Sequence, residues 1–138
     1  MNKQEITTLV ERLWYEAHPL LVASSERLTT ADPNLITSIE RYSNDAFLMR
    51  GYVTFCKSPY GDEIAIGIDI QSDNEQMSIV SDVCMDNGEI IAEGPTAIIS
   101  TSGDELSTKR SMDEWLEKFT RFLDENEPTI LKRALILQ

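Results

Sequence analysis

Residues on which catalytic and metal sites depend are scarce in this chain. Its 138 residues include one histidine, His18, and two cysteines, Cys56 and Cys84. A single histidine excludes a multi-histidine metal site, and two cysteines without CxxC spacing are too few for a disulfide scaffold. No P-loop, GxGxxG, GxSxG or HExxH motif is present. The sequence therefore predicts no catalytic residue, no cofactor and no metal, and we expect a protein that is not an enzyme.

Long apolar runs and a secretory signal pattern are also missing. No stretch approaches the ~20 apolar residues that a membrane span needs. The first residues show neither the basic segment nor the apolar segment of a signal peptide. Reduced thiols fit this context, so we expect a cytoplasmic protein without a membrane partner.

Basic residues are few: 12 Lys and Arg stand against 24 Asp and Glu, which gives a net charge of −12. Most of the excess lies in residues 44–103, where the only bases are Arg50 and Lys57. Direct binding to nucleic acid or to anionic membranes is disfavoured, because both need clustered cations. The charge favours a basic protein partner, or serves solubility alone. Hydrophobic residues make up 41% of the chain, which suits one globular domain over residues 1–138.

Helical spacing is clear at the N-terminus. Asn2 and Glu5 match a capping box, and apolar residues then recur at helical spacing. Pro19 should end or kink this helix, and residues 20–31 are left undecided between helix and loop. Asp32-Pro33 resembles a second helix start, with its end at residues 43–45. The apolar side of that second helix would be Leu35, Ile36 and Ile39.

The middle of the chain changes to a period of two. Four isoleucines alternate through residues 64–70, and turn clusters flank this run at residues 58–61 and 72–75. Asn87-Gly88 marks a third, tight turn. Together the three turns predict a four-stranded antiparallel meander with one apolar face. They place Phe55 opposite Ile64, Ile70 opposite Met77, Met85 opposite Ile90, and Met77 opposite Ile98.

Two further helices are expected after the strands. Residues 100–110 have the composition of a polar loop, and Ser111 with Glu114 matches a capping box. An apolar stripe follows over residues 111–123, residues 124–127 break it, and Pro128 would start a last helix. The fold class is therefore α+β: a four-stranded antiparallel meander, with an N-terminal helix or helices and two C-terminal helices packed on one sheet face.

The other sheet face holds the candidate binding residues. The same register pairs Arg50 with Asp69, and Asp82 with Glu93. It also brings Tyr52 over Gly67, beside Val80 and Pro95, and places Pro95 on an edge strand. An apolar patch rimmed by acids is typical of an interface, although scattered surface apolar residues are an equally good interpretation. The candidate partner-binding residues are Leu48, Arg50, Tyr52, Asp69, Val80, Asp82, Ile91, Glu93 and Pro95.

Simple interpretations account for the reactive side chains. His18 precedes a proline and is interpreted as a helix-terminal or surface residue. The two cysteines fall on strands separated by a third, too far apart for a disulfide, and an acid between them, Glu63, would raise a thiol pKa. The acids of this face could form a hard-cation site, but a solvated face is the simpler interpretation.

Three functions remain open. The first is a small acidic, non-enzymatic protein-binding module: an adaptor, chaperone-like protein or inhibitor, compatible with a homodimer. Small acidic α+β secretion chaperones share its size, charge and element types, but no motif matches them. The second is an enzyme or a binder of a small apolar ligand, using a cavity between sheet and helices. The third is an acidic mimic of nucleic acid that blocks a basic protein.

Overall fold

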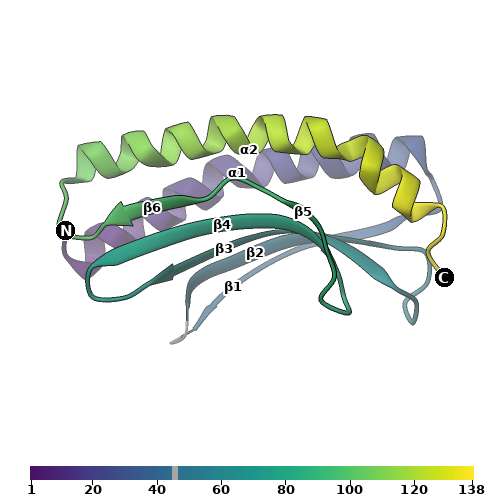
Figure 1. Cartoon of the computed structure of the whole chain (residues 1–138), viewed down its shortest axis with the longest axis horizontal. Helices are drawn as coiled ribbons and strands as arrows, with labels where there is room; N and C mark the ends of the chain where they lie inside the picture. The colour runs from purple at the N-terminus through teal and green to yellow at the C-terminus, as the bar shows by residue number, and fades with distance from the viewer. Residues whose placement is uncertain (45–46) are drawn as a thin grey trace.

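The computed structural model describes residues 1–44 and 47–138. Two long helices lie on one face of a six-stranded antiparallel sheet, which confirms the α+β class (Figure 1). The helices are α1 (Lys3–Ala31) and α2 (Glu105–Ala134). The strands are β1 (Ile36–Asn44), β2 (Phe47–Cys56), β3 (Glu63–Ser72), β4 (Gln76–Met85), β5 (Ile90–Glu93) and β6 (Ala97–Ser100).

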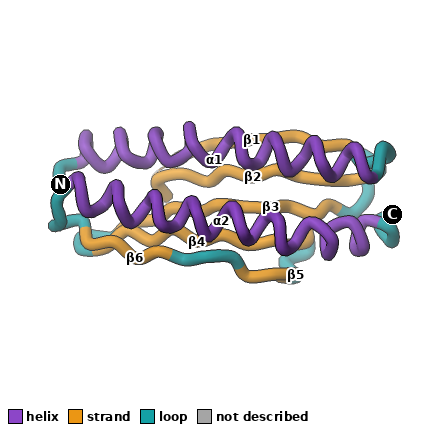
Figure 2. The backbone as a smooth tube through the Cα atoms, turned by 90° about the horizontal axis from the view of Figure 1, so that it is seen from above, coloured by secondary structure: helices purple, strands orange, loops and turns teal. Residues whose placement is uncertain are grey.

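The two helices run side by side in the same direction. Seen from above, α1 follows the β1 and β2 side of the sheet, and α2 lies over β3 and β4 (Figure 2). Ion pairs join the helices at corresponding levels: Arg12 contacts Asp113 at 3.1 Å, and Arg27 contacts Glu127 at 2.8 Å. Chain segments about a hundred residues apart therefore form one helical layer.

The predicted helix end at Pro19 is wrong, because α1 continues to Ala31. The capping box at its start is confirmed: the Glu5 amide donates to Asn2 Oδ1 at 2.8 Å, and the Asn2 amide donates to Glu5 Oε1 at 3.2 Å. Proline inside a helix costs about 3 kcal/mol. Pro19 is exposed, however, and the buried stripe continues past it through Leu21 and Leu28. Burial of that stripe outweighs the lost hydrogen bond.

The two predicted C-terminal helices are a single helix. It starts six residues before Ser111, and its N-cap is Asp104, whose side chain accepts from the Ser107 amide at 2.6 Å. The polar segment 100–110 is thus partly helical, and the break expected at residues 124–127 is absent. Pro128 is exposed within the helix. The same balance applies as at Pro19, because Ile130 and Ala134 remain buried beyond it.

The helix predicted after Asp32-Pro33 is wrong, and this segment forms β1. Pro33 lies in the turn after α1, where the Asp32 side chain accepts from the Asn34 amide at 3.2 Å. The β-branched residues that follow favour a strand, and β1 pairs with β2 in continuous register from Ile36 to Tyr42. The sheet therefore begins one strand earlier than predicted. Asp45, part of the expected helix end, lies outside the described residues.

The register between β2 and β3 is confirmed, with Phe55 opposite Ile64. Between β3 and β4 the predicted face is right but the partners differ by two residues: Ile70 faces Ile79, and Met77 faces Ser72. Asp73 explains the shift. Its carboxylate accepts from the amides of two following residues at 2.8 Å, which centres the turn one residue later than predicted.

The last predicted strand is two short strands. Val83 faces Ala92 and Asp82 faces Glu93, as predicted. A bulge next to this pair breaks the expected contact of Met85 with Ile90, and Ile90 faces Cys84 instead. The register shifts by one further residue between β5 and β6, so the predicted pair of Met77 and Ile98 is wrong. Met77 faces Ile99, which is buried, while Ile98 points to solvent.

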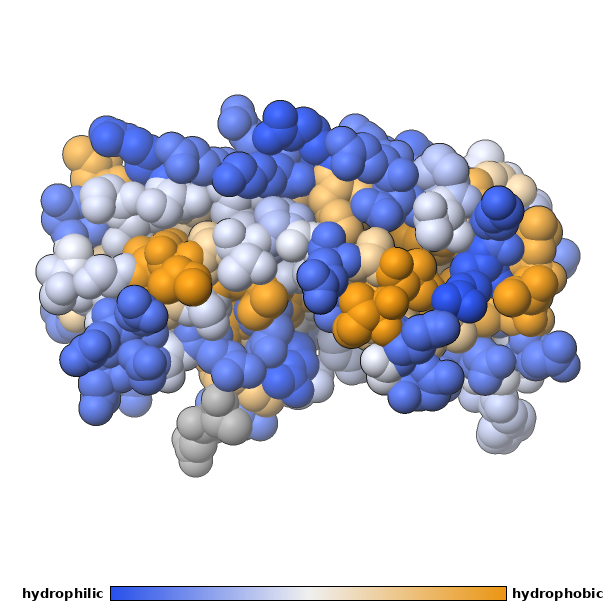
Figure 3. All heavy atoms as spheres, viewed as in Figure 1, coloured by the Kyte–Doolittle hydropathy of each residue, from blue (hydrophilic) through white to orange (hydrophobic). Residues whose placement is uncertain are grey.

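The last predicted strand lies at an edge of the sheet, as expected, but Pro95 stands outside the strands, in the segment that separates β5 from β6. The Pro95 carbonyl accepts from Trp115 Nε1 at 2.9 Å and from Ser81 Oγ at 3.0 Å, so this segment ties α2 to β4. Figure 3 shows this side of the molecule. Hydrophilic residues cover α2 along the top, and hydrophobic atoms surface in separate spots beneath it.

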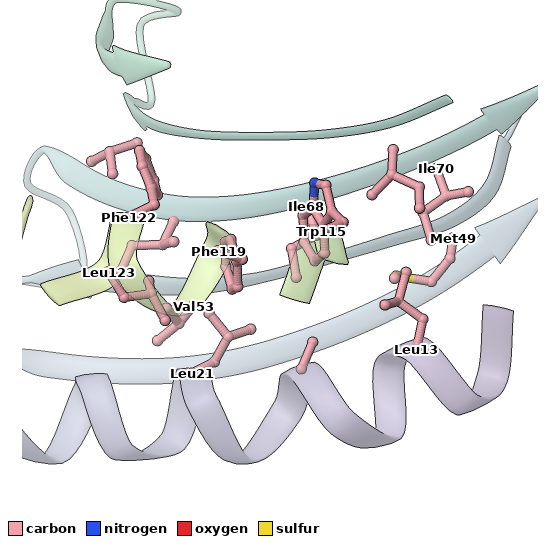
Figure 4. Packing of buried hydrophobic residues seen from close by; sticks show 14 of the residues in the cluster. Leu13, Leu21, Met49, Val53, Ile68, Ile70, Trp115, Phe119, Phe122 and Leu123 are labelled. Atoms are coloured by element: carbon pink, nitrogen blue, oxygen red, sulfur yellow. The ribbon is translucent and has the colours of Figure 1, made fainter. Parts of the chain in front are cut away.

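The core fills the space between the sheet and the two helices. Figure 4 shows large side chains from α1, β2, β3 and α2 pointing into the same layer. Trp115 and Phe119 stack there at 4.8 Å between ring centroids. The residues labelled in that view are all buried: Leu13, Leu21, Met49, Val53, Ile68, Ile70, Trp115, Phe119, Phe122 and Leu123.

Two glycines on adjacent strands give a direct test of this packing. A Cβ at Gly51 would lie 2.3 Å from the Trp14 ring, whereas a Cβ at Gly67, on the opposite face, would meet only Asp82 Oδ1 at 3.7 Å. We expect Gly51→Ala to lower the free energy of unfolding by about 1–3 kcal/mol, because the Trp14 ring must move. Gly67→Ala is the matched control and should leave stability nearly unchanged. Denaturant unfolding measures both, and an equal effect of the two substitutions would contradict the predicted packing.

Candidate functional site

The sheet face turned away from α1 and α2, here called the outer face, has no covering layer among the described residues. Side chains alternate across the strands, so each cross-strand row presents its residues together. One row runs from Arg50 to Asp69 and Val80, and the next from Tyr52 to Gly67 and Asp82. The outer face thus brings together residues from the three consecutive strands β2, β3 and β4.

A depression of about 380 Å³ lies at the centre of the outer face and is here called the Gly67 hollow. It forms because Gly67 has no side chain between its two cross-strand neighbours, Tyr52 and Asp82. Its wall mixes apolar and charged groups, which suits a ligand with an apolar stem and a charged end. The side chains that line it belong to Arg50, Tyr52, Ala65, Asp69, Val80, Asp82 and Cys84.

The cation in the hollow is already paired. The Arg50 guanidinium donates to both carboxylate oxygens of Asp69 at 3.4 Å, and this hydrogen bond is the main cause that raises the pKa of Arg50. The same guanidinium lies 4.1 Å above the Phe47 ring. Arg50 and Asp69 therefore neutralise each other and set one side of the hollow.

Tyr52 is also held in place. The Tyr52 hydroxyl donates to Glu40 Oε2 at 2.8 Å. The Tyr42 ring contacts the Tyr52 ring edge-on, with 6.0 Å between the centroids. The hydrogen bond to Glu40, and then partial burial, raise the pKa of Tyr52 to about 12. The phenol therefore stays neutral at physiological pH and presents a fixed ring beside the hollow.

Asp82 lines the hollow and, unlike Asp69, has no cationic partner among the described residues. Burial is the main cause that raises its pKa, and the carboxylates of Asp69 and Glu93 act in the same direction. The Cys84 thiol donates a hydrogen bond to Asp82, and burial followed by this carboxylate raises the pKa of Cys84. None of the ion pairs of the described residues involves Asp82 or Glu93. A cation placed in the hollow would offset the charge of Asp82 and the repulsion that Glu93 exerts on it.

Five of the nine candidate residues come together in the hollow: Arg50, Tyr52, Asp69, Val80 and Asp82. Glu93 faces Asp82 from β5, but it does not line the hollow and borders the depression beside α2 instead. Val80 was expected beside Tyr52, but the two-residue shift places it opposite Asp69.

The other three candidates lie away from the hollow. Pro95 was expected beside Tyr52, but it lies in the segment between β5 and β6 and lines a separate depression with α2. Leu48 and Ile91 are half-buried and pack against the core, Ile91 next to the bulge in β5. The bulge gives the outward position opposite Cys84 to Ile90 instead.

Two aromatic residues of this face were not predicted. The Tyr42 ring meets Phe47 edge-on at 5.4 Å between centroids, and together they back the Arg50 guanidinium. Tyr42 was missed because residues 33–43 were expected to be helical. The alternation of Ser38, Glu40 and Tyr42 is the signal that could have revealed it.

The reactive side chains stay apart from one another. Both cysteines are free thiols, as predicted. His18 is exposed, and its ring leans on Trp14 at 5.5 Å between centroids. Within residues 1–44 and 47–138, no three His, Cys, Asp or Glu side chains gather closely enough to bind a metal ion. No helix among the described residues combines the length and the apolarity that crossing a membrane requires.

Comparisons of this chain with known protein families, with curated proteins and with solved structures find no match. The geometry of the outer face therefore carries the functional argument.

Two aspartates with opposite pKa shifts predict opposite pH dependences of stability. Asp82 has a raised pKa in the folded protein, so ionising it costs stability as the pH rises above about 4. Asp73 has a lowered pKa, because the amides of Glu75 and Gln76 donate to it, so the stability that its ionisation adds is complete above about pH 4 and is lost as the pH falls below that value. We expect the free energy of unfolding of Asp82→Asn to rise relative to wild type as the pH increases above about 4. We expect that of Asp73→Asn to lie below wild type above about pH 4 and to approach wild type as the pH falls below it. Urea unfolding between about pH 2 and 7 checks both, and a difference from wild type that stays constant across this range for either variant would contradict the assignment.

Proposed function

We propose that this protein is a non-enzymatic binding module that takes a basic segment of a partner protein on its outer face. The observation that carries the proposal is the Asp82 carboxylate in the wall of the Gly67 hollow, which has no ion-pair partner among the described residues. Glu93, opposite Asp82 on β5, adds a second negative charge nearby. A partly desolvated carboxylate gains most from a cation that excludes water with it. A Lys or Arg side chain of the partner supplies that cation.

The shape of the hollow supports a long cationic side chain. The stem of Lys or Arg is apolar, and Val80 with Ala65 offers it an apolar surface. The fixed Tyr52 ring presents a face over which a cation is stabilised. Arg50 does not oppose the ligand, because Asp69 already neutralises it. The net charge of −12 adds a long-range attraction that speeds the approach of a basic partner.

The two alternative functions have less support. The space between sheet and helices is filled by large side chains such as Trp115 and Phe119, and no observation favours an apolar ligand there. An acidic mimic of nucleic acid would depend on charge over the whole surface, whereas the hollow joins charge to apolar contacts. Local substitutions separate the two cases.

Affinity capture from native lysate, followed by mass spectrometry, tests the proposal with four baits. Asp82→Lys with Glu93→Lys reverses the charge at the hollow, and Gly67→Leu fills it without changing charge. Glu114→Lys with Glu117→Lys is the matched control, since it makes the same change of charge at exposed positions of α2. We expect basic proteins captured by wild type to persist with the control and to be lost from both hollow variants.

Binding of a captured partner then gives the magnitude. We expect each hollow variant to raise the dissociation constant by roughly tenfold or more, which corresponds to a loss of about 1.4 kcal/mol in binding free energy. Added salt should weaken wild-type binding in part, because apolar contacts remain. The same capture by all four baits would contradict the proposal. Equal loss with the α2 control and the charge-reversed hollow, with Gly67→Leu unaffected, would support the acidic-mimic alternative instead.

A further inference from the structure

The two edges of the sheet differ in how they are protected. The far edge consists of β5 and β6, four residues each, separated by Gly94-Pro95-Thr96 and distorted by a bulge. Short strands, proline, bulges and charged side chains are devices by which proteins block pairing at an edge. From Ile36 to Tyr42, β1 has no proline and no bulge, and seven residues run in continuous register with β2.

The free side of β1 is well suited to another strand. An edge strand presents unpaired backbone N–H and C=O groups, and only an extended chain satisfies a row of them. β1 contains one acid and one base, and both are engaged: Glu40 accepts from Tyr52, and Arg41 pairs with Glu11 of α1. Although the chain carries a net charge of −12, this edge is locally neutral, so an identical edge meets no local repulsion.

We propose that β1 pairs antiparallel with β1 of a second copy of this chain, about a two-fold axis that passes through Ile39. This pairing places Ile36 opposite Tyr42 of the second copy on the outer face. Both side chains are large, apolar and exposed, and each covers the other. Ile39 meets Ile39 on the face beneath the helices, and the two sheets become continuous.

Charge selects this register over its neighbour. With the axis at Ile39, Glu40 lies opposite Ser38 and Arg41 lies opposite Thr37, so no like charges face each other. An axis one residue later would set Glu40 directly against Glu40 of the second copy, which is destabilising. The register about Ile39 also uses the whole of the regular segment, because β1 changes register between Tyr42 and Asn44.

An exposed aromatic side chain on α1 supports the same axis independently. Tyr15 is 80% exposed although it belongs to the helix that covers β1 and β2. It stands four residues after Glu11 and therefore on the same side of the helix, towards the β1 edge where Arg41 pairs with Glu11. Four residues of helix advance about 6 Å, and two residues of strand about 6.8 Å. β1 runs antiparallel to α1, so the step from Glu11 to Tyr15 along the helix matches the step from Arg41 back to Ile39 along the strand. Tyr15 therefore lies level with Ile39, and the two-fold axis brings the Tyr15 rings of the two copies together.

This dimer does not depend on the proposed binding of a basic partner. The two-fold axis stands perpendicular to the sheet, so both outer faces look to the same side and both Gly67 hollows stay open. Failure of the dimer would leave the partner-binding proposal untouched, and loss of partner binding in the hollow variants would leave the dimer intact.

Sedimentation velocity on the full chain tests the axis with matched variants. Wild type should be a dimer. Ser38→Glu places like charges opposite Glu40 twice per dimer, and Tyr15→Glu places two charges at the axis, so each should weaken dimerisation by roughly tenfold or more. Tyr60→Glu is the control, because Tyr60 is 99% exposed in the turn between β2 and β3. Ser38→Glu combined with Glu40→Lys should restore the dimer.

Cysteine pairing tests the register. In a chain carrying Cys56→Ser and Cys84→Ser, Ile39→Cys should form a disulfide-linked dimer under mild oxidation, because the two residues face each other. Thr37→Cys lies on the same face, but its partner is four residues away, about 13 Å, so it should not cross-link. Circular dichroism confirms that each variant is folded. A monomeric wild type, equal dimerisation of all variants, or cross-linking through Thr37→Cys rather than Ile39→Cys would overturn the proposal.

Discussion

The structure depends on the burial of one face of three central strands beneath two helices. Alternate residues of β2, β3 and β4 turn towards α1 and α2, and most of them are fully buried. Because strand side chains alternate, a dry inner face leaves the intervening residues on the other side. The polar and small residues of the outer face, including Gly67 and Asp82, therefore stand where the core does not need them and are free to take part in binding.

The hairpins were the part of the fold that sequence could best predict. Alternating isoleucines and tight turns correctly predicted which side of β2, β3 and β4 is buried, even where β3 and β4 pair two residues away from expectation. One-residue shifts in β5 and β6 turn Ile90 and Ile98 outward instead. The face of a strand depends only on residue parity, so it is robust to an even shift. Exact partners depend on turn chemistry, and the Asp73 side chain sets that chemistry by accepting two backbone hydrogen bonds.

Helix boundaries were predicted less well, and the errors at Pro19, Pro128 and Asp32-Pro33 share one cause. At each position the local proline signal for a helix end or a helix start does not decide the structure, because tertiary packing does. The first two prolines stand inside helices, because the buried stripe beyond each is long enough to outweigh a lost hydrogen bond. Asp32-Pro33 has the sequence of a helix start but forms a turn. Because β1 was predicted to be helical, Tyr42 and this edge of the sheet were missed, and the candidate site was predicted without β1.

The parallel layer of two helices has a consequence for how the chain folds. Arg12 and Arg27 of α1 contact Asp113 and Glu127 of α2, and the amino group of Met1 donates to the Thr101 carbonyl at 2.8 Å. These contacts span about a hundred residues, and such non-local closure slows folding. A chain emerging from the ribosome would therefore hold its sheet half-covered until α2 is synthesised, with the inner surface of β3 and β4 open to misassembly in the interval.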